Sequence, residues 1–433
     1  MLKYLSQIWN SKDLRNKILF TLGIVFIYRV LAHITVPGAS VEALKGLANQ
    51  NELLQVFSLL TGGSTESFSI VLMGISPYIN ASIIIQLLTV VVPKLESLSK
   101  EGDAGRRKLN SYTRWLTLPL ALLQSYGMIL LLNSQTQIPI ISDVTNPAVI
   151  LPAMLTITAG TILLVWLGEQ IGERGIGNGV SVIIFTGIIA NVPQLLGQGL
   201  FLADADESKL IPLIFIVLLT IILITVVILV NEAQRKVPIT YAGSGGAKAK
   251  KDESFLPIRI NQAGMIPIIF AVALVSFPGI IGQFLVNATS PWLRSAGTTM
   301  TTLFSPNTIS YIVIYYLLVV AFTYFYVSVT FKPEEVAENI QKRGGYIPGI
   351  RPGTQTSEYI GAVSRRLTLF GSNFIALIGV MPIVLNSSLS TSSLGSVPIL
   401  ISGAGILIIV GVVLELIRQV NAQLVMHDYK KFY

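Results

Sequence analysis

The sequence predicts an all-α integral membrane protein of ten transmembrane helices, and three observations lead to this fold class. Of the 433 residues, 52% are hydrophobic and 12% are charged, and the mean hydropathy of +0.69 is far above that of a domain facing water on all sides. The apolar residues are gathered in runs of about 20, the length that a helix needs to cross a bilayer. Basic residues are concentrated in alternate loops.

Ten apolar runs are long enough to span the bilayer. They lie at about 18–36, 75–93, 115–133, 147–167, 179–200, 211–231, 262–286, 308–331, 367–387 and 398–417. Apart from Glu415 at the end of the last run, only the first run holds Asp, Glu, Lys, Arg or His side chains, namely Arg29 and His33. We expect these two to reach the membrane surface or pack against a partner helix. The polar segment before this run and the lack of a small-residue cleavage site predict no cleavable signal peptide.

The basic residues predict the orientation of the spans, because cytoplasmic loops carry an excess of Lys and Arg. Only Lys45, Lys209 and Arg294 fall on the opposite side, and Arg29 lies inside a span. We therefore expect both termini in the cytoplasm. The net charge of +8 therefore mainly reflects the topology of the chain. The basic residues could also bind anionic lipid or a docked partner, and we do not expect DNA binding.

The runs divide the chain into two halves of five spans each. Because five is odd, any structural similarity between the halves must be inverted. We expect an N-terminal half at 1–200, an external linker at 201–210 and a C-terminal half at 211–433, with large cytoplasmic loops at 232–260 and 332–366. Two such halves around a midplane constriction are plausible.

One further apolar segment, at 53–73, is too interrupted to cross the bilayer. Small polar residues and Glu66 break it in the middle. A broken helix at membrane depth is tolerated only where protein or water surrounds it. The residues alone leave two interpretations open, an external hairpin, which is the simpler, and a re-entrant plug.

The second run, GISPYINASIIIQLL, contains both a helix breaker and polar side chains. Pro77 has no amide hydrogen and predicts a kink at the start of the helix. Ile75 and Ile79 are four residues apart and share one face. Polar side chains at bilayer depth must contact a partner helix or water, and here they are Asn80, Ser82 and Gln86. Helix packing and a functional seam both remain open.

Four long motifs follow one another along the chain: GISPYINASIIIQLLTVVVPKLESLSKEGDAGRRKLNSYTR from Gly74, WLGEQIGERGIGNGVSVIIF from Trp166, RINQAGMIPIIFA from Arg259 and GGYIPGIRPGTQTSEYI from Gly344. In this order they resemble the SecY family, the pore subunits of bacterial protein-translocation channels. The resemblance covers essentially the whole chain. It implies two inverted five-helix halves around an hourglass pore in the bacterial cytoplasmic membrane, which passes unfolded secretory polypeptides and releases apolar segments sideways into lipid.

The resemblance also implies a ring of apolar side chains at the waist of the pore. The matching positions are Ile75, Ile79, Val180, Ile184, Ile269 and Ile408. All are β-branched aliphatic residues, which offer no polar group to hydrate an ion, so the ring can close by dewetting. Their contacts are non-directional and can yield to a passing chain.

By the same resemblance, the broken segment at about 54–73 is the plug, and the second and seventh spans form a lateral gate. The centre of the plug is Leu60, Thr61, Gly62, Gly63, Ser64, Thr65, Glu66 and Ser67. In the gate, Asn80 and Gln86 are expected to face Asn261 and Gln262. Polar side chains on both lips suit a seam that must open toward lipid.

Basic residues in the two large loops are the expected docking site for a motor or a ribosome. They are Arg235, Lys236, Lys248, Lys250, Lys251 and Arg351, the last held in the turn PGIRPG. The resemblance implies SecE and SecG as partner subunits, the SecA motor and the ribosome on the cytoplasmic face, and signal peptides as substrates. The loop tip GSGGAKAKKDES departs from the family, which usually has an arginine-rich hairpin there.

No enzyme activity, cofactor or metal is expected. The sequence has no cysteine, its two histidines are far apart, and it contains neither GxxxxGK[ST] nor HExxH. The glycines at 175–179 follow a membrane run, not a strand. The alternative function is a secondary transporter, which shares inverted halves and broken helices but usually places charged residues in its core spans. An intramembrane protease lacks a nucleophile and base pair. We therefore favour a passive conduit driven by a motor or ribosome.

Overall fold

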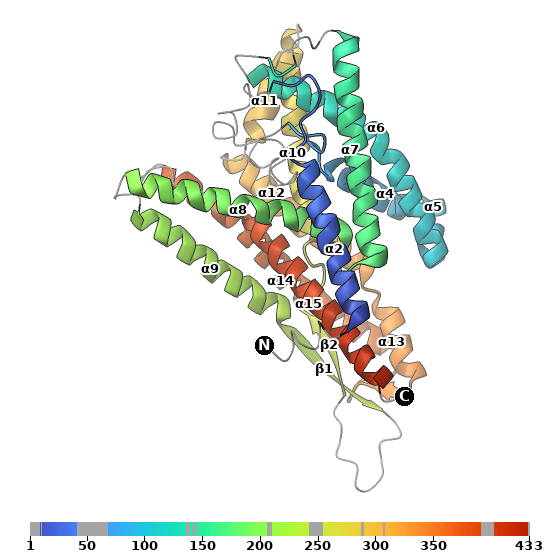
Figure 1. Cartoon of the computed structure of the whole chain (residues 1–433). Helices are drawn as coiled ribbons and strands as arrows, with labels where there is room; N and C mark the ends of the chain where they lie inside the picture. Colours follow the sequence, from blue (N-terminus) through green and yellow to red (C-terminus); the bar gives the residue numbers. More distant parts are fainter. Residues whose placement is uncertain are drawn as a thin grey trace.

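In the residues that it describes, the computed structural model contains helices and one small sheet (Figure 1). It describes residues 9, 11–40, 68–135, 139–141, 144, 146–205, 210–241, 254–286, 290–305, 308–390 and 402–431. Every predicted apolar run overlaps a helix in these ranges. The mostly helical membrane fold class is therefore confirmed.

The described helices are distributed over both halves of the chain. The first half of the chain contains α2 (Lys12–Leu31), α4 (Ser76–Val91), α5 (Pro93–Lys100), α6 (Asp103–Gln135), α7 (Pro147–Arg174) and α8 (Gly179–Ala205). The second half contains α9 (Leu210–Glu232), α10 (Ile266–Val286), α11 (Pro291–Leu303), α12 (Ile309–Thr330), α13 (Pro333–Lys342), α14 (Thr354–Ser390) and α15 (Gly403–Lys431).

Six of the described helical segments are long and apolar enough to cross a membrane. They are α7, α8 through Phe201, α9, α12 continuing into α13, α14 and α15, and the bent pair α4–α5 would be a seventh. The chain is thus a multi-pass membrane protein. On α9 the side chains of Leu218 and Ile221 are 56% and 57% exposed, as expected of apolar residues that face lipid.

The bend near α4 lies at a different proline from the one that the sequence suggested. Pro77 occupies the first turn of α4, where its missing N–H leaves no helical hydrogen bond unmade, so α4 begins there without a kink. The sharp bend, 101° between α4 and α5, lies before Pro93. Val92 is extended, with φ −100° and ψ 112°, because a residue that precedes proline avoids the helical region.

The linker predicted at 201–210 overlaps the end of α8. Residues 201–205 continue α8, and α9 begins at Leu210, because Leu and Ala in this stretch are strong helix formers. α8 and α9 contact each other, and both also pack against α15. The end of α8 and the start of α9 lie at one edge of the molecule (Figure 1).

A three-stranded antiparallel sheet lies at the end of the molecule that carries the C-terminus (Figure 1). Its order is β2-β1-β3, with β1 (Gln234–Tyr241), β2 (Ser254–Arg259) and β3 (Gly345–Tyr346). Val237 and Ile239 of β1 are buried in a small core with Ile340 and Ile360. The sheet therefore joins the loop after α9 to the segment between α13 and α14.

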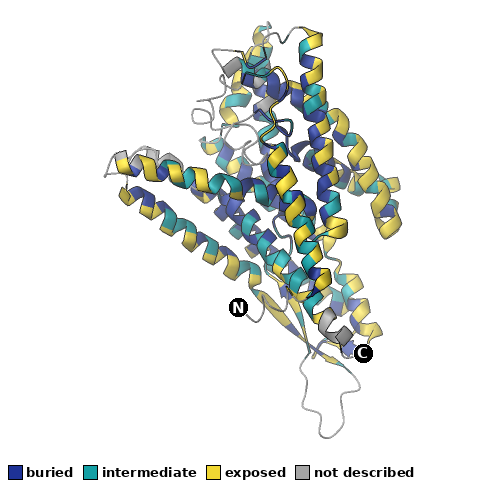
Figure 2. Ribbon diagram, in the orientation of Figure 1, coloured by how far each residue is buried: buried dark blue, intermediate teal, exposed yellow. Residues whose placement is uncertain are grey.

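The main core lies where helices of both halves meet. Its largest buried cluster takes residues from α2, α4, α7, α8, α9, α10, α12, α14 and α15. Figure 2 shows buried residues along the centre of the bundle and exposed residues on its outer helix faces. The interface between the halves is thus the place where a central site can form.

Candidate pore, gate and docking surfaces

The residues expected to form the ring lie in this shared core. The five isoleucines among them are at most 6% exposed and belong to one buried cluster. Val180, near the start of α8, is half-buried and packs against that cluster. The isoleucines come from the start of α4 and from α8, α10 and α15: Ile75, Ile79, Ile184, Ile269 and Ile408.

Three of these residues also line one cavity. Ile184, Ile269 and Ile408 project from α8, α10 and α15 around a space of about 80 Å³. Ile75 and Ile79 lie elsewhere in the same buried cluster. The structure thus brings part of the expected ring around a common space, and the rest packs in the surrounding core.

The two helices of the expected lateral gate, α4 and α10, pack against each other. The side chain of Gln86, however, donates a hydrogen bond of 3.2 Å to Ser82 on its own helix. Asn80, on the same helix, is half-buried. The two helices are thus adjacent, and the lateral gate itself stays a prediction.

The two polar residues expected on the other side of this gate, Asn261 and Gln262, bond to the C-terminal half of the chain. Asn261 donates to Asn231 at 2.6 Å and accepts from the N–H of Gly264 at 2.9 Å. Gln262 accepts a bond of 2.9 Å from Ser364 on α14. Both residues precede α10 in a turn where an Asn side chain can bond to the backbone a few residues ahead. These bonds tie the start of α10 to α9 and α14 instead of to α4.

The central plug residues, 60–67, lie outside the described residues. The end of the expected plug segment is described and deeply buried, with Phe68, Val71 and Leu72 at 0% exposure. The N–H of Val36 donates to the carbonyl oxygen of Phe68, and that of Ile70 donates to the carbonyl oxygen of Ile34, both at 2.9 Å. This end of the segment therefore pairs with the residues that follow α2, and Phe68 and Leu72 pack in a core with α6 and α7.

Two of the expected docking residues, Arg235 and Lys236, are exposed on β1. They pair with Ile258 and Pro257 of β2, respectively. One face of the sheet packs on the small core that contains Val237. The two basic side chains therefore lie on a strand whose position is fixed by packing. Lys248, Lys250 and Lys251 lie outside the described residues.

Arg351 is exposed in a turn that two glycines shape. Gly349 and Gly353 have φ values of +82° and +102°, which only glycine adopts without strain. The hydroxyl of Thr356 donates a bond of 2.9 Å to the carbonyl oxygen of Arg351. This bond fixes the backbone of Arg351, and the exposed guanidinium group of Arg351 faces solvent.

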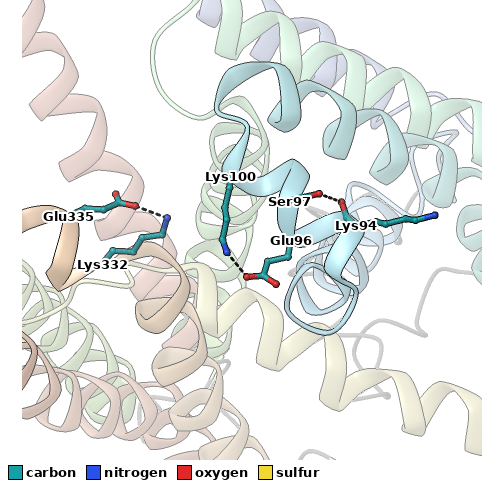
Figure 3. A network of polar contacts seen from close by, with 6 residues as sticks. All are labelled: Lys94, Glu96, Ser97, Lys100, Lys332 and Glu335. Carbon is teal, nitrogen blue, oxygen red and sulfur yellow. Dashed lines mark hydrogen bonds and ion pairs between the residues drawn. The ribbon is translucent and has the colours of Figure 1, made fainter.

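Several surface polar contacts were not predicted from the sequence. Figure 3 shows Lys100 bonded to Glu96 at 2.6 Å and Lys332 bonded to Glu335 at 2.8 Å. The hydrogen bond from Lys100, together with its charge, lowers the pKa of Glu96. Such exposed pairs add little to stability, because solvent screens the attraction and ordering two long side chains costs entropy. Their spacing of three or four residues on a helix is the signal that could have found them.

Two further ion pairs join elements that are distant in the sequence. Arg114 of α6 contacts Glu169 of α7, and Arg418 of α15 contacts Glu232 of α9, both at 2.5 Å. Burial and the nearby charge of Arg418 lower the pKa of Arg259. Within the described ranges, no three His, Asp and Glu side chains are grouped to hold a metal ion.

Comparison with known proteins gives consistent matches. A family model for SecY matches residues 69–417. The protein translocase subunit SecY of Aquifex aeolicus is 39% identical over 439 residues, covering 100% of this chain and 99% of the relative. A solved SecY structure has a TM-score of 0.64 at 18% identity, covering 94% of this chain and 92% of the other. In that SecY protein, a plug domain stabilises the closed state of the translocation channel and maintains a membrane seal. Sec61 in the canine ribosome-channel complex has a TM-score of 0.63 at 17% identity, with the same coverage.

Proposed function

Because the chain belongs to the SecY family, we propose that it forms the channel through which unfolded secretory polypeptides cross the bacterial cytoplasmic membrane. Full-length similarity to a translocase subunit is the observation that carries this function. The alternative of a secondary transporter receives no support from the relatives. The same channel would release apolar segments of membrane proteins into the lipid.

The constriction of this channel would be the ring of aliphatic side chains around Ile184, Ile269 and Ile408. Their convergence on one cavity supports this assignment, as does the burial of Ile75 and Ile79 in the same core. A narrow apolar constriction excludes ions because water leaves it. Aliphatic contacts have no preferred direction, so they can separate around a polypeptide of any sequence.

We place ten spans in two inverted halves, 1–200 and 211–433, around an hourglass pore. Besides the six helices with clear spanning character, α2, α6, α10 and the α4–α5 pair would complete the set. The segment centred on 60–67 would close the pore from outside, and the burial of Phe68 and Leu72 at its end supports that location. The contact between α4 and α10 would be the lateral gate.

Both termini and the sheet would face the cytoplasm, where the basic loops lie. Arg235, Lys236 and Arg351 would contact a partner that supplies force, since the chain carries no nucleotide-binding motif of its own. The ribosome-bound state of a structural relative supports a ribosome as one such partner. A SecA motor would be the other, and SecE and SecG would be the membrane partners, with anionic lipids around the basic loops.

Site-directed crosslinking tests this function, because the sequence has no native cysteine. Single cysteines would replace Ile184, Ile269 and Ile408, and a secretory chain would be arrested during export. We expect crosslinks from all three positions. A cysteine at Ile221, which is 57% exposed on α9, is the matched control and should give none. Equal crosslinking at Ile221 and at the three core positions would refute the assigned path.

A further inference from the structure

Polar contacts between side chains fasten several helices of this protein to one another. Arg114 of α6 pairs with Glu169 of α7 at 2.5 Å. The hydroxyl of Tyr316 on α12 donates a hydrogen bond to Asn373 of α14. Such bonds matter in a membrane, because lipid tails are as apolar as a leucine side chain and give apolar helices little reason to associate. Polar contacts therefore show which helices are firmly joined.

The start of α10 is fastened in this way to the C-terminal half. Asn261, just before α10, donates a hydrogen bond of 2.6 Å to Asn231 of α9. Gln262 accepts a hydrogen bond of 2.9 Å from Ser364 of α14. These two bonds lie side by side in the sequence and reach two different helices. A movement of α10 away from α9 and α14 would break both.

The seam between α4 and α10 differs from these contacts. On α4, Gln86 donates to Ser82 at 3.2 Å, and Thr89 donates to the carbonyl oxygen of Gln86 at 2.6 Å. On α10, the hydroxyl of Ser276 donates to the carbonyl oxygen of Val272 at 2.8 Å. Among the described residues of these two helices, each side-chain hydrogen bond thus stays within its own half of the chain.

The two helices nevertheless pack against each other, through aliphatic side chains. Members of one buried cluster on α4 and α10 are Ile79, Ile83, Ile268, Val272 and Val275. When the helices separate, these side chains lose dispersion contacts with each other. Lipid tails or another apolar helix can supply similar contacts in their place.

We propose that apolar packing alone holds α4 against α10, so that an apolar helix of a substrate can part them without breaking a hydrogen bond. This inference rests on the proposed channel function and names the chemistry that controls its lateral gate. An apolar helix exchanges one set of aliphatic contacts for another. A polar segment cannot replace those contacts, so the seam selects its substrate by hydropathy.

The separation of α4 from α10 can be measured between two spin labels on the full-length protein in lipid nanodiscs. The sequence has no native cysteine, so labels can be attached to cysteines at Leu87 of α4 and Leu274 of α10, both exposed. The probe is a leucine-rich peptide of about 20 residues, long enough to cross the bilayer. We expect this peptide to add a population at longer distance. A serine-rich peptide of the same length should add none.

A second pair of labels serves as the control for a bonded interface. Leu317 of α12 and Leu369 of α14 are both exposed, on the two helices that the bond from Tyr316 to Asn373 joins. The distance between labels at these positions should stay the same with either peptide.

Variants of α4 separate packing from hydrogen bonding. Ile83 is 4% exposed, and Ile83→Ala removes aliphatic contacts from the seam, so the long-distance population should rise about fivefold. Ile83→Val should give a smaller rise in the same direction, and it serves where the alanine variant does not fold. Gln86→Leu keeps the bulk of the side chain and removes its bond to Ser82. It should leave the population unchanged.

Three results would overturn the proposal. An equal rise in Gln86→Leu and Ile83→Ala would mean that a polar contact holds the seam. An unchanged population in both variants of Ile83 would exclude apolar packing, and opening by the serine-rich peptide would exclude selection by hydropathy. The labels report separation whether or not a polypeptide crosses the membrane. A failure to crosslink arrested chains would therefore refute the channel function and leave this measurement valid.

Discussion

The backbone N–H of Gly177 donates a hydrogen bond of 2.7 Å to the side-chain oxygen Oε1 of Gln419. Gly177 lies in the turn between α7 and α8, and Gln419 lies on α15. The preceding N–H, of Ile176, donates to the hydroxyl of Thr21 on α2 at 3.1 Å. One tight turn thus fastens the last helix of the chain to the N-terminal half.

Replacing Gly177 with alanine should loosen this connection. Gly177 has a φ of +90°, and a Cβ there would lie 2.6 Å from a methyl group of Leu416. Backbone strain of this kind costs about 1–3 kcal/mol, so the midpoint of thermal unfolding in detergent should fall. Gly172→Ala is the matched control, because no neighbouring segment comes within 4 Å of its Cβ position. An equal fall in both variants would contradict the role of the turn.

The positions of the helices were predictable where the helix has to cross the hydrocarbon core of the bilayer. A run of about 20 apolar residues has few alternatives to a spanning helix, so every run coincided with a helix. The polar extensions were not predictable in the same way. α6 begins at Asp103, well before the apolar run at 115, and α15 continues to Lys431, because a helix can extend into water where hydropathy gives no signal.

The site was predictable only in part, and for a different reason. An isoleucine inside an apolar run carries no mark of a pore position, so the ring depended on family resemblance. The partners of Asn261 and Gln262 were missed because a local turn, not a helix face, orients them. The β1–β2 pairing had a signal in the alternation of Val237 and Ile239, but contacts such as Gly177 with Gln419 have no local pattern.

Polar substitutions in the ring should make resting channels leak ions. Replacing Ile79 and Ile184 together with serine adds two hydroxyls to a buried aliphatic cluster, and these would hold water in a constriction that otherwise dewets. Conductance across planar bilayers should rise above that of the unaltered protein. Ile221→Ser, on the exposed face of α9, should leave it unchanged. If the double variant conducts no more than Ile221→Ser, the assignment of these residues to a pore ring is wrong.

Reversing the charge at Arg351 should block motor-dependent export without harm to the fold. The side chain is exposed and its backbone is held by Gly349, Gly353 and Thr356, so Arg351→Glu changes only what a partner meets. We expect export to slow about tenfold, equivalent to roughly 1.4 kcal/mol of docking free energy. Arg343→Glu is an equally exposed charge reversal in the same loop. Similar export by the two variants would show that charge alone, and not the turn, matters.

The pair Arg114 and Glu169 should contribute modestly to the packing of α6 on α7. Their side chains are 55% and 20% exposed, so solvent screens the attraction, and Arg114→Glu should cost about 1 kcal/mol or less. The exchanged variant Arg114→Glu with Glu169→Arg should regain most of that loss. A double-mutant cycle of unfolding free energies measures the coupling, and a coupling of zero would reduce the contact to a chance approach of two surface charges.

The close approach of α14 and α15 next to the cavity should tolerate no added side-chain atom at Gly403. A Cβ on Gly403 would lie 2.0 Å from the carbonyl oxygen of Ile378 and 3.0 Å from the Cα of Gly379. Both are backbone atoms, so no side-chain rotation can relieve the overlap, and Gly403→Ala must push the helices apart. We expect a loss of about 3 kcal/mol or more in the free energy of unfolding, at the upper end for overpacked cores. Gly23→Ala on α2, with no atom within 4 Å of its Cβ position, should be neutral or slightly stabilising, because alanine favours a helix over glycine by about 1 kcal/mol. Equal unfolding midpoints for the two variants would mean that α14 and α15 do not touch at this point, and the cavity that their contact encloses would lose one of its walls.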